Sequence, residues 1–456
     1  MDEIPSGRPN ESHSENEQEH SDTDGEAESP RQPVEEPAEE GSAGTAPPTD
    51  WRSGYRLVMS VREFQALWLS HVLSMTGTSL LSIAVTVLVY QQTNSAVASG
   101  ITLAMTFLPQ AVGGVLLAGL ADIFPRRQII IASDLIRGIL VLAIGWPGLP
   151  VWAIWTLLFF VILPTMPFAA ARAALMADIV QGERYVAGSA IINLTTQAGQ
   201  IGGLLLGGAV LTLIGPNSTM LLNGIAFALA ALIVWAGVRF RPSTLADNED
   251  NSRYWGITLE GFRMVAVDYR LRTLTLLAWL AGCYAVPLAL ANPLADELGG
   301  DAGTVSLIMG AVPVGALVGG LVLTRLVNPA LRMRLLLPLA VLTSAPLLGF
   351  AADPPLWILL GLLAVSGMCG SYQFVANAAF VLCTPEQSRG RAFGLVASGL
   401  QAVQGLGMLL GSLLLAVTST QLTVALAGAC GVVLALLLTR PWHRVMPGVL
   451  EQVRTP

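Results

Sequence analysis

The chain has 456 residues, of which 53% are apolar and 12% are charged, and its mean hydropathy is +0.62. Soluble globular domains carry about 25% charged residues, so this composition excludes a soluble enzyme or a nucleic-acid-binding protein and is typical of a membrane protein. The formal net charge of −7 originates in the first fifty residues.

Residues 1–50 hold fifteen acidic residues and two arginines, are rich in Ser, Pro and Glu, and contain no apolar run that could start a core. We expect a disordered acidic tail in the cytoplasm. The rest of the chain has 16 acidic and 22 basic residues and is net positive. The start shows no signal-peptide pattern, so the first apolar span is expected to act as its own insertion signal.

Twelve mostly apolar stretches follow, each of about 18 to 25 residues, which is long enough to cross a hydrocarbon core of roughly 30 Å as a helix. They lie near residues 67–90, 97–120, 128–146, 151–175, 188–213, 217–237, 272–294, 303–325, 334–351, 356–382, 394–416 and 420–439. Lipid leaves the backbone no partner outside the segment, and a membrane β-barrel has only short alternating segments, so the spans are helices.

The arginines predict the orientation of these helices. All 24 basic residues are arginine; the predicted loops after spans 1, 3, 5, 7, 9 and 11 contain none, whereas those after spans 2, 4, 6, 8 and 10 all contain some. Positive loops face the cytoplasm, so we expect a multi-pass protein with both termini inside. The predicted parts are a first six-helix bundle at 51–238, a cytoplasmic linker at 239–271, a second six-helix bundle at 272–440 and a cytoplasmic tail at 441–456.

The loop between spans 2 and 3 reads LAGLADIFPRRQ and has the highest density of charged residues in the first membrane half. Asp122 ends span 2 and needs a cation or the positive end of a neighbouring helix, such as span 11 after Arg391. Such a contact would latch the two bundles and break when the cytoplasmic side opens. Alternatively, Asp122 and Arg126 only cap helix ends.

Asp134 and Arg137 lie one turn apart on one face of span 3, roughly 10 to 14 Å from its cytoplasmic start. Charge inside a membrane span predicts function. Three roles stay open: a structural or gating pair, proton coupling through Asp134, or direct contact with a transported molecule.

The two bundles share an internal repeat. A shift of 206 residues places Gly113-Gly114 over Gly319-Gly320 and Arg126 over Arg332, and a shift of 204 places Gln197 and Gln200 over Gln401 and Gln404, with Gly203 and Gly207 over Gly407 and Gly411. Parallel halves with a site between them near the bilayer midplane are how alternating-access transporters are built.

With these features the chain resembles the major facilitator superfamily over nearly all of residues 60–440. The segment GLADIFPRRQ is similar to the signature loop of this family at Gly119, Asp122, Arg126 and Arg127, although Ile123 and Pro125 depart from it. LWLSHVLSMTGTSL, TFLPQAVGGVLLAGLAD and SDLIRG are similar to the drug:proton antiporter branch, which includes macrolide and siderophore exporters. The resemblance implies a bacterial plasma-membrane transporter with the gating loop just described.

Two departures bear on coupling. Exporters of this branch commonly have a Gly-Pro pair in span 5, where this chain has Gly203 and Leu204, and an acidic residue in span 1, where it has Thr78. The first weakens the resemblance to an antiporter, and the second removes a candidate proton carrier.

Polar residues at helical spacing outline a candidate cavity, because a stripe of amides facing lipid is costly. They are His71, Ser74 and Thr78 in span 1, Asn193, Gln197 and Gln200 in span 5, Tyr372, Gln373 and Asn377 in span 10, and Gln401 and Gln404 in span 11. Each has packing between helices as its alternative role. Apart from His71 the outline holds no fixed charge, which favours a neutral or amphipathic small molecule over a sugar, an ion or phosphate.

The sequence shows no cysteine or histidine spacing for a metal, no hydrolytic constellation and no phosphate-binding loop, so we expect no enzyme activity and no cofactor. The leading hypothesis is a monomeric secondary transporter that exports a small amphipathic compound, such as a drug, antibiotic or siderophore-like molecule, by alternating access coupled to protons. The alternatives are an uptake carrier or uniporter of the same fold, and a membrane sensor that transports nothing and uses its acidic tail.

Overall fold

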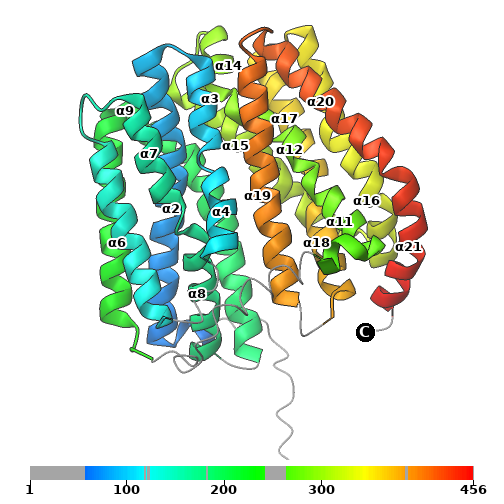
Figure 1. Cartoon of the computed structure of the whole chain (residues 1–456), viewed down its shortest axis with the longest axis horizontal. Coiled ribbons are helices and arrows are strands. Elements are labelled where there is room, and N and C mark those ends of the chain that lie inside the picture. The colour runs from blue at the N-terminus through cyan, green and yellow to red at the C-terminus, as the bar shows by residue number, and fades with distance from the viewer. Residues whose placement is uncertain are drawn as a thin grey trace, which may run out of the picture. The chain divides into compact units, whose positions relative to one another are not determined.

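The computed structural model describes residues 57–117, 120, 124–180, 183–241, 263–385 and 389–454. The predicted acidic tail 1–50, most of the linker 239–271, and the loop residues Gly119 and Asp122 lie outside the described residues. Residues 50–456 form one compact unit, and its described part consists of helices and the turns between them (Figure 1).

The first half of this unit follows the predicted spans closely. Its helices are α2 (Arg62–Thr93), α3 (Ala96–Ala104), α4 (Leu108–Leu116), α6 (Arg126–Ile144), α7 (Val151–Ile162), α8 (Thr165–Ile179) and α9 (Glu183–Gly237). Spans 2 and 4 are each divided into two helices, and α8 follows Pro164 directly. Proline lacks the N–H that continues the helical hydrogen bonds, which accounts for this break.

The second half is more segmented. Its elements are α11 (Tyr269–Trp279), α12 (Ala281–Tyr284), α13 (Val286–Ala289), α14 (Ala291–Glu297), α15 (Ala302–Leu326), α16 (Pro329–Ser344), the 3₁₀ helix η1 (Ala345–Ala352), α17 (Leu356–Gly370), α18 (Tyr372–Cys383), α19 (Arg389–Leu414), α20 (Thr420–Leu437) and α21 (Thr439–Arg454). The seventh predicted span therefore comprises four short helices, with Pro287 and Pro293 near the starts of two of them.

By length and composition, ten helical segments of the described residues can cross a membrane. One of them contains both the fifth and sixth predicted spans, which meet at Gly215, where φ is 76°, just before Pro216. The third predicted span, α6, has 19 residues and four charged side chains, and it is not among the ten. The predicted fold class, an all-α membrane protein, is confirmed. The count of twelve spans stays a prediction, which requires α6 to be a span and the two parts of α9 to be separate spans.

Glycines at repeat-equivalent positions let helices pack closely in both halves. Gly203 of α9 lies against Ser79 of α2, and its repeat mate Gly407 of α19 lies against the backbone of Gly282 in α12. A Cβ at either position would overlap its neighbour. Span 5 thus packs on span 1 in the same way as span 11 packs on span 7, so the two halves share this helix contact.

The halves also meet each other through equivalent pairs of helices. α9 packs on α15, and α19 packs on α3 and α4 (Figure 1). At these contacts Gly208 lies against Ser306, and Gly100 lies against Ser412.

The buried side chains of the described residues form three cores that differ in whether they join the two halves. One core, the shared core, contains residues of both halves, among them Leu103 and Ile154 from the first and Leu290 and Ile308 from the second. Each of the other two cores belongs to one half and lies toward the arginine-bearing helix ends. The core of the first half contains Phe64, and the core of the second half takes its residues from the range 265–449. The halves are therefore packed together at one end and have separate cores at the arginine-rich end.

The segment predicted as a C-terminal tail continues the helical structure. α21 packs on α16, α18 and α11, and it buries Trp442, Val445 and Val449 in the core of the second half.

Candidate functional site

A cavity of about 470 Å³ lies between the two halves of the unit. Its wall takes residues from α2, α3, α4, α6, α7, α8 and α9 of the first half and from α12, α13, α15 and α19 of the second. The hydrogen bond from Gln401 Nε2 to Gln110 Oε1, 2.7 Å long, joins α19 to α4 within this wall. The cavity is therefore built from both repeats, as the sequence predicts.

The structure brings six of the eleven predicted cavity residues together on this wall. They are His71, Ser74, Thr78, Gln200, Gln401 and Gln404. Gln200 is exposed to the cavity, whereas His71 and Ser74 are each 1% exposed. His71 Nε2 lies 2.8 Å from Thr196 Oγ1 of α9, and His71 Nδ1 has no hydrogen-bond partner among the described residues.

The other five predicted residues lie off this wall. Asn193 is exposed and Gln197 and Asn377 are half-buried. Tyr372 OH donates to the carbonyl of Leu277, and Gln373 Nε2 donates to the carbonyl of Ala278. These two side chains of α18 bind the backbone of α11, so they fasten one helix to another.

The intramembrane charge pair sits directly behind the wall. Ser74 Oγ donates to both carboxylate oxygens of Asp134 at 3.1 Å, and Arg137 NH1 lies 3.9 Å from Asp134 Oδ1. Asp134 is fully buried and Arg137 is 3% exposed. Ser74 and Arg137 line the cavity, so the carboxylate contacts it through these two side chains.

Two arginines line the cavity, which corrects the expectation that the outline holds no fixed charge apart from His71. Arg137 projects from α6, and its guanidinium lies 5.0 Å from the ring centre of Phe168 and 5.9 Å from that of Phe227, within the range of cation–π attraction. Arg172, one turn after Phe168 on α8, was not among the predicted site residues. Its position inside the fourth apolar span was the signal in the sequence, since charge within a span predicts function.

The two described arginines of the predicted gating loop bind within the first half. Arg126 NH1 donates to Asp178 Oδ2 of α8 at 2.6 Å, and Arg127 donates to the carbonyl of Trp235 in α9. The loop arginines thus tie the start of α6 to the ends of α8 and α9. The proposed latch to span 11 involves Asp122, which lies outside the described residues.

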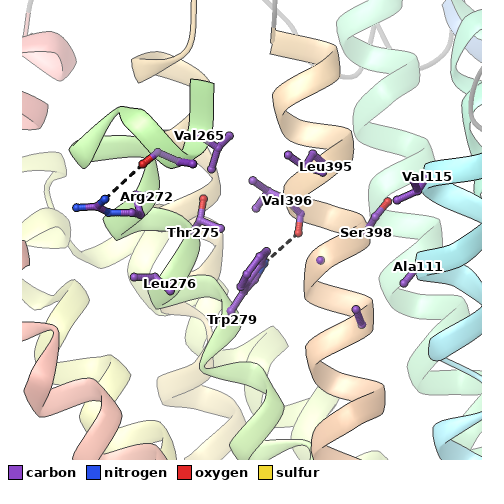
Figure 2. Close-up of a pocket in the computed structure, with 13 residues that line it drawn as sticks. Ala111, Val115, Val265, Arg272, Thr275, Leu276, Trp279, Leu395, Val396 and Ser398 are labelled. Carbon is purple, nitrogen blue, oxygen red and sulfur yellow. Dashed lines mark hydrogen bonds between the residues drawn. The ribbon is translucent and has the colours of Figure 1, made fainter. Parts of the chain in front are cut away.

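A second, apolar cavity of about 300 Å³ is lined by residues of α4, α11 and α19 (Figure 2). Ala111 and Val115 of α4, Trp279 of α11 and Leu395 of α19 line it. Trp279 Nε1 donates to the carbonyl of Val396 at 3.3 Å, which holds the indole across from α19 (Figure 2).

Comparison with known proteins identifies the family. A model of the Major Facilitator Superfamily matches residues 67–286 and again residues 273–451. The chain belongs to this superfamily of membrane transporters, and the two matches together cover both halves and overlap at residues 273–286.

Among curated relatives, the chain is similar to the enterobactin exporter EntS of Shigella dysenteriae serotype 1 (strain Sd197). The two are 27% identical over 359 residues, which cover 76% of this chain and 83% of the relative. It is also 25% identical over 281 residues to the uncharacterized MFS-type transporter YvqJ of Bacillus subtilis (strain 168), covering 58% of this chain and 65% of YvqJ. The predicted similarity to siderophore exporters is thereby confirmed.

Solved structures show the same fold. A POT family transporter in complex with 5-aminolevulinic acid superposes with a TM-score of 0.67 at 11% identity, covering 85% of this chain and 96% of the other. A bacterial homolog of the human lysosomal transporter Spinster, in an inward-facing and unoccupied conformation, gives a TM-score of 0.62 at 14% identity, covering 88% and 98%.

Proposed function

We propose that this secondary transporter exports a small amphipathic compound from the cytoplasm by alternating access, coupled to protons. The observation that carries the proposal is the cavity between the two repeats, with a buried carboxylate directly behind its wall. The similarity to an enterobactin exporter supports export and a siderophore-like or drug-like substrate. On this proposal the protein works as a monomer with both termini in the cytoplasm.

The two halves are closed against each other at one end only, which supports loading of the substrate from the cytoplasm. At the end away from the arginines the halves are joined by hydrogen bonds from Asn292 Nδ2 to Ser99 Oγ at 2.8 Å and from Tyr90 OH to Asp296 Oδ2 at 3.0 Å. The arginine-rich ends have separate cores and are the cytoplasmic side by the orientation rule. An exporter in this state is ready to take up its substrate from inside the cell.

Asp134 is the proposed proton carrier. Among the described acidic residues it alone is buried, and its two cavity-facing neighbours, Ser74 and Arg137, provide a path to the substrate. A carboxylate that gains or loses a proton changes its attraction to Arg137, and this charge change can bias one state of the transporter over the other.

The test is efflux of a panel of lipophilic dyes and antibiotics from energised bacteria that lack their own pumps, with and without a protonophore. We expect wild-type efflux to collapse with the protonophore and to be lost in Asp134→Asn. Asp301→Asn is the matched control, because Asp301 caps α15 away from the cavity and Asn caps helices equally well. Wild-type efflux that ignores both the protonophore and Asp134→Asn would contradict the proposal and favour the uptake carrier.

A further inference from the structure

Arg172 is the one cavity-lining charge for which the described part of the chain provides no counter-ion. It lines the cavity from α8, and its Nε and NH1 atoms are buried without a hydrogen-bond partner among the described residues. Arg137, in contrast, has Asp134 as its acidic neighbour. The described ion pairs of the transporter otherwise join Arg126, Arg239 and Arg241 to acids at the helix ends.

A guanidinium in this position is costly unless something in the cavity pairs with it. Burying a charge away from water without a partner carries a large desolvation penalty, and buried charges in proteins are paired or hydrogen-bonded. Apart from Arg137, which has Asp134 beside it, the other polar groups of the wall are amides and hydroxyls, together with His71 on α2. A ligand with an anionic group would therefore be bound more tightly than its neutral counterpart.

We propose that the cavity selects amphipathic molecules with a carboxylate or a similar planar oxyanion, and that Arg172 holds this group. The planar guanidinium of arginine matches two carboxylate oxygens with two parallel N–H donors. The apolar part of the ligand lies against Phe107, Leu288 and Met309, which line the same cavity. The proposal rests on the proposed function, because it names the substrate class of the same cavity.

The charges near Arg172 favour a ligand-binding role for this side chain over a purely structural role. Phe168, one turn before Arg172 on α8, stacks under Arg137, so the two guanidinium groups share one side of the cavity. Together they carry two positive charges against the single carboxylate of Asp134. An anion bound at Arg172 would balance this excess.

The test measures binding to the purified transporter in lipid nanodiscs at neutral pH, where a carboxylic acid is ionised. The probes are biphenylcarboxylate and its uncharged isostere biphenylcarboxamide, with naphthoate and naphthamide as a second pair, and the readout is the dissociation constant from the rise in unfolding temperature. We expect the carboxylates to bind about ten- to a hundred-fold more tightly than the amides, which is the range for a hydrogen bond to a charged group. Arg172→Gln should abolish this preference while leaving amide binding in place.

Two further variants keep the result interpretable. Arg172→Lys retains the charge and should retain part of the preference, and Arg325→Gln makes the same change as Arg172→Gln at an exposed position near the end of α15, so it should keep the full preference. Equal affinity for both members of each pair in the wild type, or an unchanged preference in Arg172→Gln, overturns the proposal. This measurement does not depend on efflux. The carboxylate preference can therefore hold where proton-driven export fails, and proton-driven export can hold where the carboxylate preference fails.

Discussion

The hydroxyl of Ser74 is the contact that fixes Asp134 at the cavity wall. It donates to both carboxylate oxygens from α2, whereas the charge contact with Arg137 is longer, at 3.9 Å. A hydrogen bond to a charged group contributes about 1.5–3 kcal/mol. Ser74→Ala should therefore slow proton-driven efflux, but by less than Asp134→Asn, because the carboxylate itself remains. The initial rate of dye efflux at matched protein levels measures the difference.

Ser366→Ala is the control for this prediction. Ser366 is also fully buried, and its hydroxyl bonds the carbonyl of Thr343 between α17 and α16, away from the cavity and from any charge. Its loss should leave the efflux rate of the folded protein unchanged. Equal effects of Ser74→Ala and Ser366→Ala would show that the loss of a buried hydroxyl matters and the orientation of Asp134 does not.

The polar residues of the site could be predicted from the sequence, but the directions in which their side chains point were harder to predict. His71, Ser74 and Gln200 were predicted from helical spacing and do line the cavity. Tyr372 was predicted with equal reason, yet its hydroxyl reaches a backbone carbonyl of α11. Spacing shows which residues share a face of a helix, but the packing of neighbouring helices decides which face turns inward. Arg172 was not predicted, because it is a single arginine in span 4 with no acidic residue one helical turn away.

At the scale of helices, close packing at glycine is the property most open to test. The position of Gly407 in α19 puts its α-carbon against the carbonyl of Gly282 in α12, so an added methyl group would overlap backbone that cannot move aside. Overpacking of this kind typically costs about 1–3 kcal/mol. Gly407→Ala should lower the unfolding temperature of the purified protein.

Gly361→Ala provides the comparison in the same fold. Gly361 lies inside α17 with no atom within 4 Å of an added Cβ, and alanine is a better helix former than glycine by about 0.8–1.0 kcal/mol. The substitution should leave the unfolding temperature unchanged or raise it. A drop in Gly361→Ala as large as that in Gly407→Ala would mean that the lower unfolding temperature of Gly407→Ala does not come from the contact between α19 and α12.

The positions of the helices were predictable, and their interruptions were not. Twenty-residue apolar runs identify the spans because the bilayer requires that length. The division of the seventh span into α11, α12, α13 and α14 was not predicted, since a helix inside a bundle tolerates proline where neighbours satisfy the freed backbone groups. The helix α21 was also missed, because it buries only one face against the second half and its composition resembles that of a polar tail.

For the whole molecule, the repeat in the sequence predicts the two halves. It does not predict at which end the two halves are closed against each other. A protein with two conformations typically has them within a few kcal/mol of each other, so a sequence that is compatible with both does not identify which one is adopted. The shared core and the bonds from Asn292 to Ser99 and from Tyr90 to Asp296 define which end is closed here.

If export requires alternating access, these bonds must break in every cycle. We therefore expect that joining Ser99→Cys to Asn292→Cys with a short, cleavable bifunctional thiol reagent stops efflux, and that reduction of the link restores it. The control is Glu297→Cys with Thr420→Cys, which replaces a hydrogen bond of 2.6 Å at the same end but within the second half. This link joins α14 and α20 within the same half, so it should leave efflux intact. Full efflux in protein shown by mass spectrometry to be linked between residues 99 and 292 would mean that the halves do not separate at this end during transport.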